Sequence, residues 1–173
     1  MQTIRFHFDF ISPYAYLAWT RMEDLAAPLH PLVVGVKAEA PPTSTAIATL
    51  ARLRPDLDTM GGLGGLFLID ELRAGATGTM TGFAVPERLV SIVRTFPADP
   101  AAAEAEWAGL LPLMRLEAFP PYSLAARKEV WRLRGVIGSA RCRRKGAELD
   151  EVARADVRRA VAAVLGPDPA SPG

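Results

Sequence analysis

The stretch LVVGVKAEAPP, residues 32–42, decides how the rest of the sequence is interpreted. Its first five residues are aliphatic or glycine and mostly β-branched, which is typical of a strand buried on both faces in a parallel sheet. Lys37 closes this strand, and Pro41 and Pro42 prevent its continuation. In α/β folds chemistry is placed at the carboxyl ends of parallel strands, where burial disfavours the ammonium form and leaves an amine that attacks carbonyls. The alternative is that Lys37 extends from the strand end into solvent.

Strands alternate with helices on both sides of this stretch. A period-two pattern predicts a strand over 3–10, and Ser12 and Pro13 are suited to begin a helix that runs to Ala27. The same signals predict strands over 32–37, 57–60 and 75–82, and helices over 43–53, 66–73, 86–96, 101–117, 123–134 and 148–165. Four βα units in succession predict an α/β fold with a parallel sheet, followed by a helical layer and a frayed tail over 166–173.

The composition indicates a globular chain without a polyanionic partner. It has 173 residues, 50% of them hydrophobic, and a net charge of +1, so we expect no nucleic-acid partner, and we interpret the basic run 141–145 as a solvated loop. Cys142 is the one cysteine and an incidental thiol, which fits a reducing cytoplasm.

Neither a membrane span nor a signal peptide is expected. His7 and His30 lie far apart and no zinc-type spacing occurs, so we expect no metal.

Two glycine-rich stretches follow the central strand. GGLGG at 61–65 allows the backbone to approach a ligand or a helix, but it lacks the dinucleotide-binding pattern, so packing is the favoured interpretation. The small residues of 75–82 permit either tight packing or a pocket floor. Between them Asp70 and Glu71 lie on a predicted helix, where we expect solvated carboxylates.

Three stretches resemble the C-terminal half of the dihydrodipicolinate synthase/N-acetylneuraminate lyase family: LVVGVKAEAPPT (32–43), GGLGGLFLIDELRAGATGTMTGFAVPERLVSIV (61–93) and LAARKEVWRLRG (124–135). The resemblance spans about residues 32–165. It implies a (β/α)8 barrel with a helical C-terminal extension. It also implies a lyase of the class I aldolase type, without a cofactor, that forms a Schiff base with pyruvate or another small 2-keto acid.

The same resemblance assigns roles to five residues. It implies that Lys37 is the Schiff-base lysine. It places Gly62 and Gly64 at the end of the seventh barrel strand, and Gly78 and Met80 in the keto-acid pocket at the eighth.

The first residues resemble a different family. FDFISPYAYLAW (8–19) is similar to the opening of 2-hydroxychromene-2-carboxylate isomerases and kappa-class glutathione transferases, which are thioredoxin-like. The resemblance implies a glutathione site in which Ser12 helps to activate the thiol. The hydroxyl of Ser12 also suits a plain helix N-cap.

We therefore expect four segments: a thioredoxin-like start over 1–30, a partial barrel over 31–97, a helical extension over 98–165 and a disordered tail over 166–173. The predicted function is a 2-keto acid lyase, impaired because the family's first barrel strands are missing. The alternatives are a glutathione-dependent isomerase and a non-catalytic fusion remnant with a seam near 27–31. An open half-barrel exposes apolar edges, so we expect a homo-oligomer.

Overall fold

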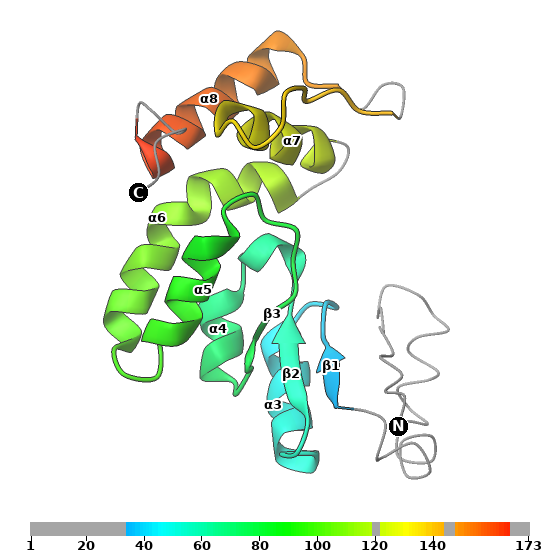
Figure 1. Ribbon diagram of the computed structural model, residues 1–173. Coiled ribbons are helices and arrows are strands. Elements are labelled where there is room, and N and C mark those ends of the chain that lie inside the picture. Colours follow the sequence, from blue (N-terminus) through cyan, green and yellow to red (C-terminus); the bar gives the residue numbers. More distant parts are fainter. Residues whose placement is uncertain (1–33, 119–121, 144–147, 167–173) are drawn as a thin grey trace. The chain divides into compact units, whose positions relative to one another are not determined.

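The computed structural model describes residues 34–118, 122–143 and 148–166 (Figure 1). The chain divides into two compact units, unit 1 over residues 1–81 and unit 2 over residues 82–173. The segment boundaries predicted from the sequence, at 30/31 and 97/98, stay predictions.

Unit 1 contains a three-stranded parallel sheet in the order β1-β2-β3, formed by β1 (Gly35–Lys37), β2 (Asp58–Gly61) and β3 (Gly78–Thr79). Helix α3 (Thr43–Leu53) joins β1 to β2, and the short helix η1 (Leu63–Gly65) and α4 (Leu68–Arg73) join β2 to β3 (Figure 1). The predicted alternation and parallel pairing are confirmed for these three strands and the helices between them. The first predicted unit, over 3–27, lies outside the described residues.

The two faces of this sheet differ in burial, so the prediction that the first strand is buried on both faces is wrong for its described residues. Val36 and Thr59 are register partners and are buried at 8% and 1% exposure. Val36 clusters with Leu50 of α3 and with Leu57, so this face packs against the helices. Lys37 belongs to the alternate row, in which side chains point to the opposite face of the sheet.

The strand predicted over 75–82 is shorter than expected. Only Gly78–Thr79 forms β3, because the preceding backbone completes the end of α4. The N–H of Gly75 donates to Leu72 O and that of Ala76 donates to Glu71 O, and Gly75 adopts φ +99°, which favours glycine. Periodicity does not separate a helix C-terminus of small residues from a glycine-rich strand.

Unit 2 is helical and consists of α5 (Pro86–Thr95), α6 (Pro100–Ala118), α7 (Ser123–Leu133) and α8 (Glu151–Leu165). The four predicted helices are confirmed to within a few residues. The last helix begins three residues later than predicted, because the side chain of Asp150 accepts a hydrogen bond from Ala153 N at 2.7 Å and caps the helix. Pro86 occupies the first turn of α5, where its missing N–H has no helical partner to lose.

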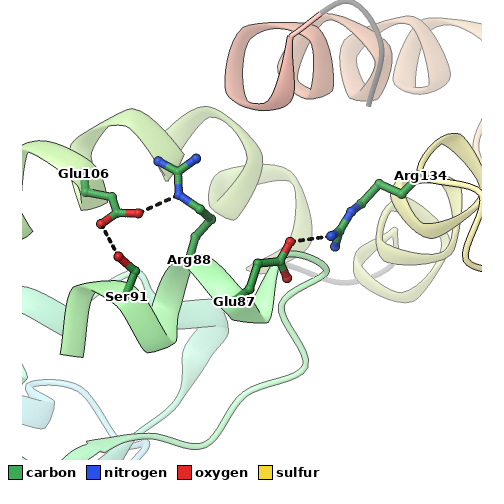
Figure 2. Close-up of polar contacts among 5 residues, drawn as sticks. All are labelled: Glu87, Arg88, Ser91, Glu106 and Arg134. Atoms are coloured by element: carbon green, nitrogen blue, oxygen red, sulfur yellow. Dashed lines mark hydrogen bonds and ion pairs between the residues drawn. The ribbon is translucent and has the colours of Figure 1, made fainter. Parts of the chain in front are cut away.

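Polar contacts connect the helices of unit 2 (Figure 2). The carboxylate of Glu106 on α6 accepts hydrogen bonds from two side chains of α5, those of Arg88 and Ser91, the latter at 2.9 Å. Arg134, just after α7, pairs with Glu87 on α5. Such contacts fix the register of helices whose apolar faces provide most of the stability.

We predict that Leu113→Ala lowers the free energy of unfolding by about 2–5 kcal/mol, because the Leu113 side chain is fully buried in α6 and its loss leaves a cavity. Leu124→Ala is the matched control, since Leu124 is 50% exposed on α7, and it should change stability by less than about 0.5 kcal/mol. Urea unfolding followed by circular dichroism measures both. Equal losses would contradict the assigned core.

Candidate active site

Lys37 ends β1 at the carboxyl edge of the sheet, and its amine forms an ion pair with Glu39. Its Nζ lies 2.8 Å from Oε1 of Glu39, and both side chains are only 21% exposed. Lys37 and Glu39 are two residues apart, so their side chains leave an extended backbone on the same side, with buried Ala38 between them. The amine therefore lies in a partly desolvated ion pair rather than free in solvent.

The loop after β2 holds Glu39 in place. The N–H of Leu63 donates to Glu39 Oε1 at 3.2 Å. The same oxygen therefore accepts this hydrogen bond and pairs with the Lys37 ammonium. A Cβ atom on Gly62 would lie 2.1 Å from this oxygen. Only glycine at position 62 leaves room for the carboxylate, which explains this part of the GGLGG stretch.

Glu71 brings a second carboxyl group to the same loop. It is fully buried, and within the described residues neither of its carboxylate oxygens accepts a hydrogen bond of ordinary geometry. A Cβ atom on Gly61 would lie 1.7 Å from Glu71 Oε2. The pKa of Glu71 is raised to about 7, chiefly by burial and also by the charges of Asp70 and Glu39, while the Thr43 hydroxyl opposes the rise.

The predicted solvation of the two α4 carboxylates is therefore wrong for Glu71, whereas Asp70 has a 56% exposed side chain. The sequence carried a signal for this difference. Glu71 lies three residues after Leu68 and one before Leu72, on the helical stripe that faces the core. Glu39 was given no role from the sequence, although its spacing from Lys37 places both on one side of the strand end.

The structure places the other predicted site residues around this edge. Gly78 lies in the same cross-strand row as Lys37, with Met60 between them, and a Cβ atom on Gly78 would meet nothing within 4 Å. Gly64 is buried in η1 with φ +72°, a conformation that favours glycine.

Met80 follows β3 and is 38% exposed, and its N–H donates to Gly61 O at 2.9 Å. Binding of a keto acid by Gly62, Gly64, Gly78 and Met80 stays a prediction. Ser12 lies outside the described residues.

Other kinds of site have less support in the part of the chain that the structure describes. Residues 34–118, 122–143 and 148–166 contain no cluster of three potential metal ligands. None of the helices placed there combines the length and apolar character needed to cross a bilayer. Cys142 is buried at 5% exposure.

Unit 2 contains a cavity of about 310 Å³ between α7, α8 and the residues that join them. Glu129 and Arg132 in its lining form a two-pronged ion pair at 2.8 and 2.9 Å, and Arg154 donates to Leu149 O at 3.3 Å. These charges largely satisfy one another. The cavity lies in unit 2 and Lys37 lies in unit 1, so the cavity gives no evidence about the lysine site.

Unit 2 also contains a buried carboxyl group, that of Glu117. Its Oε2 accepts from Ala84 N at 3.0 Å and from Arg127 Nε at 3.3 Å. Burial raises the pKa of Glu117 to about 7, whereas Arg127 and the Ala84 N–H oppose that rise. The amide and guanidinium donors anchor this carboxyl group, so its role is structural.

The site therefore defines a parallel α/β protein with a lysine paired to a carboxylate at a strand end. Comparison with solved structures shows similarity to the dihydrodipicolinate synthase from Rhodopseudomonas palustris, with 34% sequence identity and a TM-score of 0.71. The match covers 74% of this chain and 44% of that chain, so this chain spans less than half the length of that protein. A scan against protein-family models and a search of curated proteins found no match.

The likeness supports the predicted dihydrodipicolinate synthase/N-acetylneuraminate lyase family, because it extends to sequence as well as fold. The isomerase-like start stays a prediction.

We predict that Glu71→Gln removes a pH-dependent loss of stability. The folded-state pKa of about 7 lies above the ordinary 4.5, so between these values the folded chain holds more protons than the unfolded chain, and wild-type stability falls as pH rises. At about pH 8 the variant should be more stable than wild type by about 3 kcal/mol, relative to their difference at pH 4.5. Urea unfolding at both pH values measures this difference.

Asp70→Asn is the control from the same helix. Its exposed carboxylate should have less than about 1 kcal/mol of effect between the two pH values. If the stability of Glu71→Gln changed with pH in parallel with that of wild type, Glu71 would not be the source of the pH dependence of stability.

Proposed function

We propose that the chain is a lyase of the class I aldolase type, in the dihydrodipicolinate synthase/N-acetylneuraminate lyase family, and that Lys37 forms a Schiff base with a small 2-keto acid such as pyruvate. One observation carries the proposal. Lys37 ends a parallel strand beside a proton acceptor, in a chain 34% identical to a dihydrodipicolinate synthase. In parallel α/β folds this strand end is the usual place for catalytic groups.

The first chemical requirement is a neutral amine. An ammonium has no lone pair, so the Lys37 Nζ must release a proton before it attacks, and Glu39 Oε1 at 2.8 Å is placed to accept it. The amine then attacks the carbonyl carbon of the keto acid. The nitrogen then gives up its two protons, the former carbonyl oxygen takes up two protons and leaves as water, and the nitrogen electron pair completes the carbon–nitrogen double bond.

The sheet face that carries Lys37 offers space for the substrate. Gly78 is two strands away in the same row, and neighbouring strands are spaced by roughly 4.8 Å, so the two positions lie about 10 Å apart. The open space above Gly78 suits a three-carbon keto acid held between the two positions. In this proposal Gly62 and Gly64 shape the loop beside the lysine, and Met80 provides an apolar boundary.

Imine formation needs only the amine and its proton acceptor. Making or breaking a carbon–carbon bond also requires acid–base groups positioned at the reacting carbons. The predicted impairment of that later step stays a prediction. No observation in the described residues favours the glutathione-dependent isomerase or the non-catalytic alternative.

Borohydride trapping with pyruvate tests the proposal. Reduction of the imine should leave a covalent pyruvate-derived adduct on Lys37 in the wild-type chain and none in Lys37→Ala, read by intact mass and peptide mapping. The sequence contains only three lysines, Lys37, Lys128 and Lys145, so the map is unambiguous. Lys128→Arg is the matched control and should keep the adduct.

A folded wild-type sample, verified by circular dichroism, that gives no adduct on Lys37 would overturn the proposed function. An adduct of equal yield on Lys128 would indicate non-specific amine chemistry and would also count against it.

We also propose that the chain acts as a homo-oligomer. Parallel sheets are normally covered on both faces. Among the described residues of unit 1, Val34 is 53% exposed just before β1 and Met80 is 38% exposed just after β3. Light scattering coupled to size-exclusion chromatography should give a mass of at least twice the 18.6 kDa chain, and a stable monomer would refute this proposal.

A further inference from the structure

Two carboxyl groups lie over adjacent glycines at the carboxyl end of the sheet. The carboxyl of Glu71 occupies the place of a Cβ atom on Gly61, and that of Glu39 occupies the place of a Cβ atom on Gly62. Glu39 also binds the Lys37 amine at 2.8 Å. The groups therefore form a series from Lys37 to Glu39 to Glu71, in which Glu39 is the member whose charge acts on Glu71.

Glu71 has no evident structural task in this series. It is fully buried, yet within the described residues neither of its oxygens accepts a hydrogen bond of ordinary geometry, although the Thr43 hydroxyl lies close enough to oppose the rise of its pKa. A buried polar group without partners costs stability, and an apolar side chain would fill the same space at lower cost. Its charge is coupled to that of Glu39, the partner of Lys37, and this coupling points to chemistry.

We propose that Glu71 is a positioning residue for the Lys37 amine: once ionised, it promotes transfer of the Lys37 proton to Glu39. In this step the bond from Nζ to the proton breaks and a bond from Glu39 Oε1 to the proton forms. The electron pair stays on Nζ, which is then neutral and nucleophilic. The inference rests on the proposed Schiff-base function, because it concerns the amine that this function requires.

The sign of the effect follows from the direction in which the proton moves. A proton that leaves Lys37 for Glu39 moves toward Glu71, and a negative charge at Glu71 favours that movement. The groups that face Glu71 are Asp70 on its own helix, Glu39 after β1 and the Thr43 hydroxyl of α3. With the pKa of Glu71 near 7, its charge appears as pH rises through neutrality.

The magnitude is measurable. A charge acting over several ångströms in a partly buried site shifts a neighbouring proton equilibrium by a factor on the order of ten. The rate of imine formation should therefore rise near pH 7, where Glu71 ionises.

The test measures imine formation with pyruvate, trapped by cyanoborohydride on the full chain, between about pH 5.5 and 9. Wild type should show a rise near pH 7. Glu71→Gln keeps the shape of the protonated carboxyl group but cannot ionise, so it should match wild type at the acid end, lack the rise, and be roughly tenfold slower above pH 8.

Asp70→Asn is the matched control on the same helix. It should keep the rise and move it to slightly lower pH, because the Asp70 charge raises the pKa of Glu71. A Glu71→Gln chain that retains the rise near pH 7 overturns the inference. So does one that is slower by the same factor at every pH, which is the result of a merely structural role.

A second measurement separates this inference from the proposed function. Competitive acetylation of Lys37 by acetic anhydride, with Lys128 as internal standard, reports the free amine without any keto acid. If pyruvate gives no adduct but the acetylation profile of Lys37 loses its rise in Glu71→Gln, the proposed function fails and the inference stands. If pyruvate gives an adduct and both profiles are unchanged by Glu71→Gln, the proposed function stands and the inference fails.

Discussion

The parallel pairing of β1 with β2 is the constraint on which the candidate site depends. This register sets Lys37 beside Met60, so the residues just beyond it, Ala38 to Glu39, reach the loop that follows β2. The N–H of Leu63 can then bind Glu39 Oε1. A slip of one residue would turn Lys37 toward the helices and Val36 away from them, because side chains alternate between the faces of a strand. Burial of Val36 against Leu50 and Leu57 opposes that slip.

Glycine does at this edge what no other residue can do. Gly61 and Gly62 each give the space of a missing Cβ atom to a carboxyl group, at 1.7 Å from Glu71 Oε2 and 2.1 Å from Glu39 Oε1. Neither glycine has a positive φ, the conformation that usually explains a glycine. The requirement is therefore steric, and the GGLGG stretch combines it with a conformational requirement at Gly64, where φ is +72°.

Much of the fold could be predicted from the sequence, because strong periodicity and turn residues mark the elements. The strand ending at Lys37 and the helix over 43–53 both follow from local patterns and both were found, although the strand is not buried on both faces as predicted. Local patterns fail where residues lack side chains, as in 75–82, where only the hydrogen bonds of Gly75 and Ala76 reveal a helix end.

The candidate site was predictable in part. Lys37 is conspicuous as the one charge at the end of an aliphatic run. Glu39 and Glu71 can be recognised as parts of the site only from the structure, in which the loop after β2 packs against both carboxyl groups.

Two buried carboxyl groups, those of Glu117 and Glu71, show why burial alone does not indicate a function. Glu117 and Glu71 both have a pKa raised to about 7, with burial as the largest cause. Glu117 is held by the N–H of Ala84 and by Arg127, and these donors offset the cost of its burial and make it an anchor of unit 2. In the described structure Glu71 accepts no hydrogen bond of ordinary geometry, the Thr43 hydroxyl only partly opposes the rise of its pKa, and its neighbours Asp70 and Glu39 are acidic. A chain that tolerates this cost beside its paired lysine keeps a carboxyl group whose charge changes near neutral pH, and that property is useful to the lysine rather than to the fold.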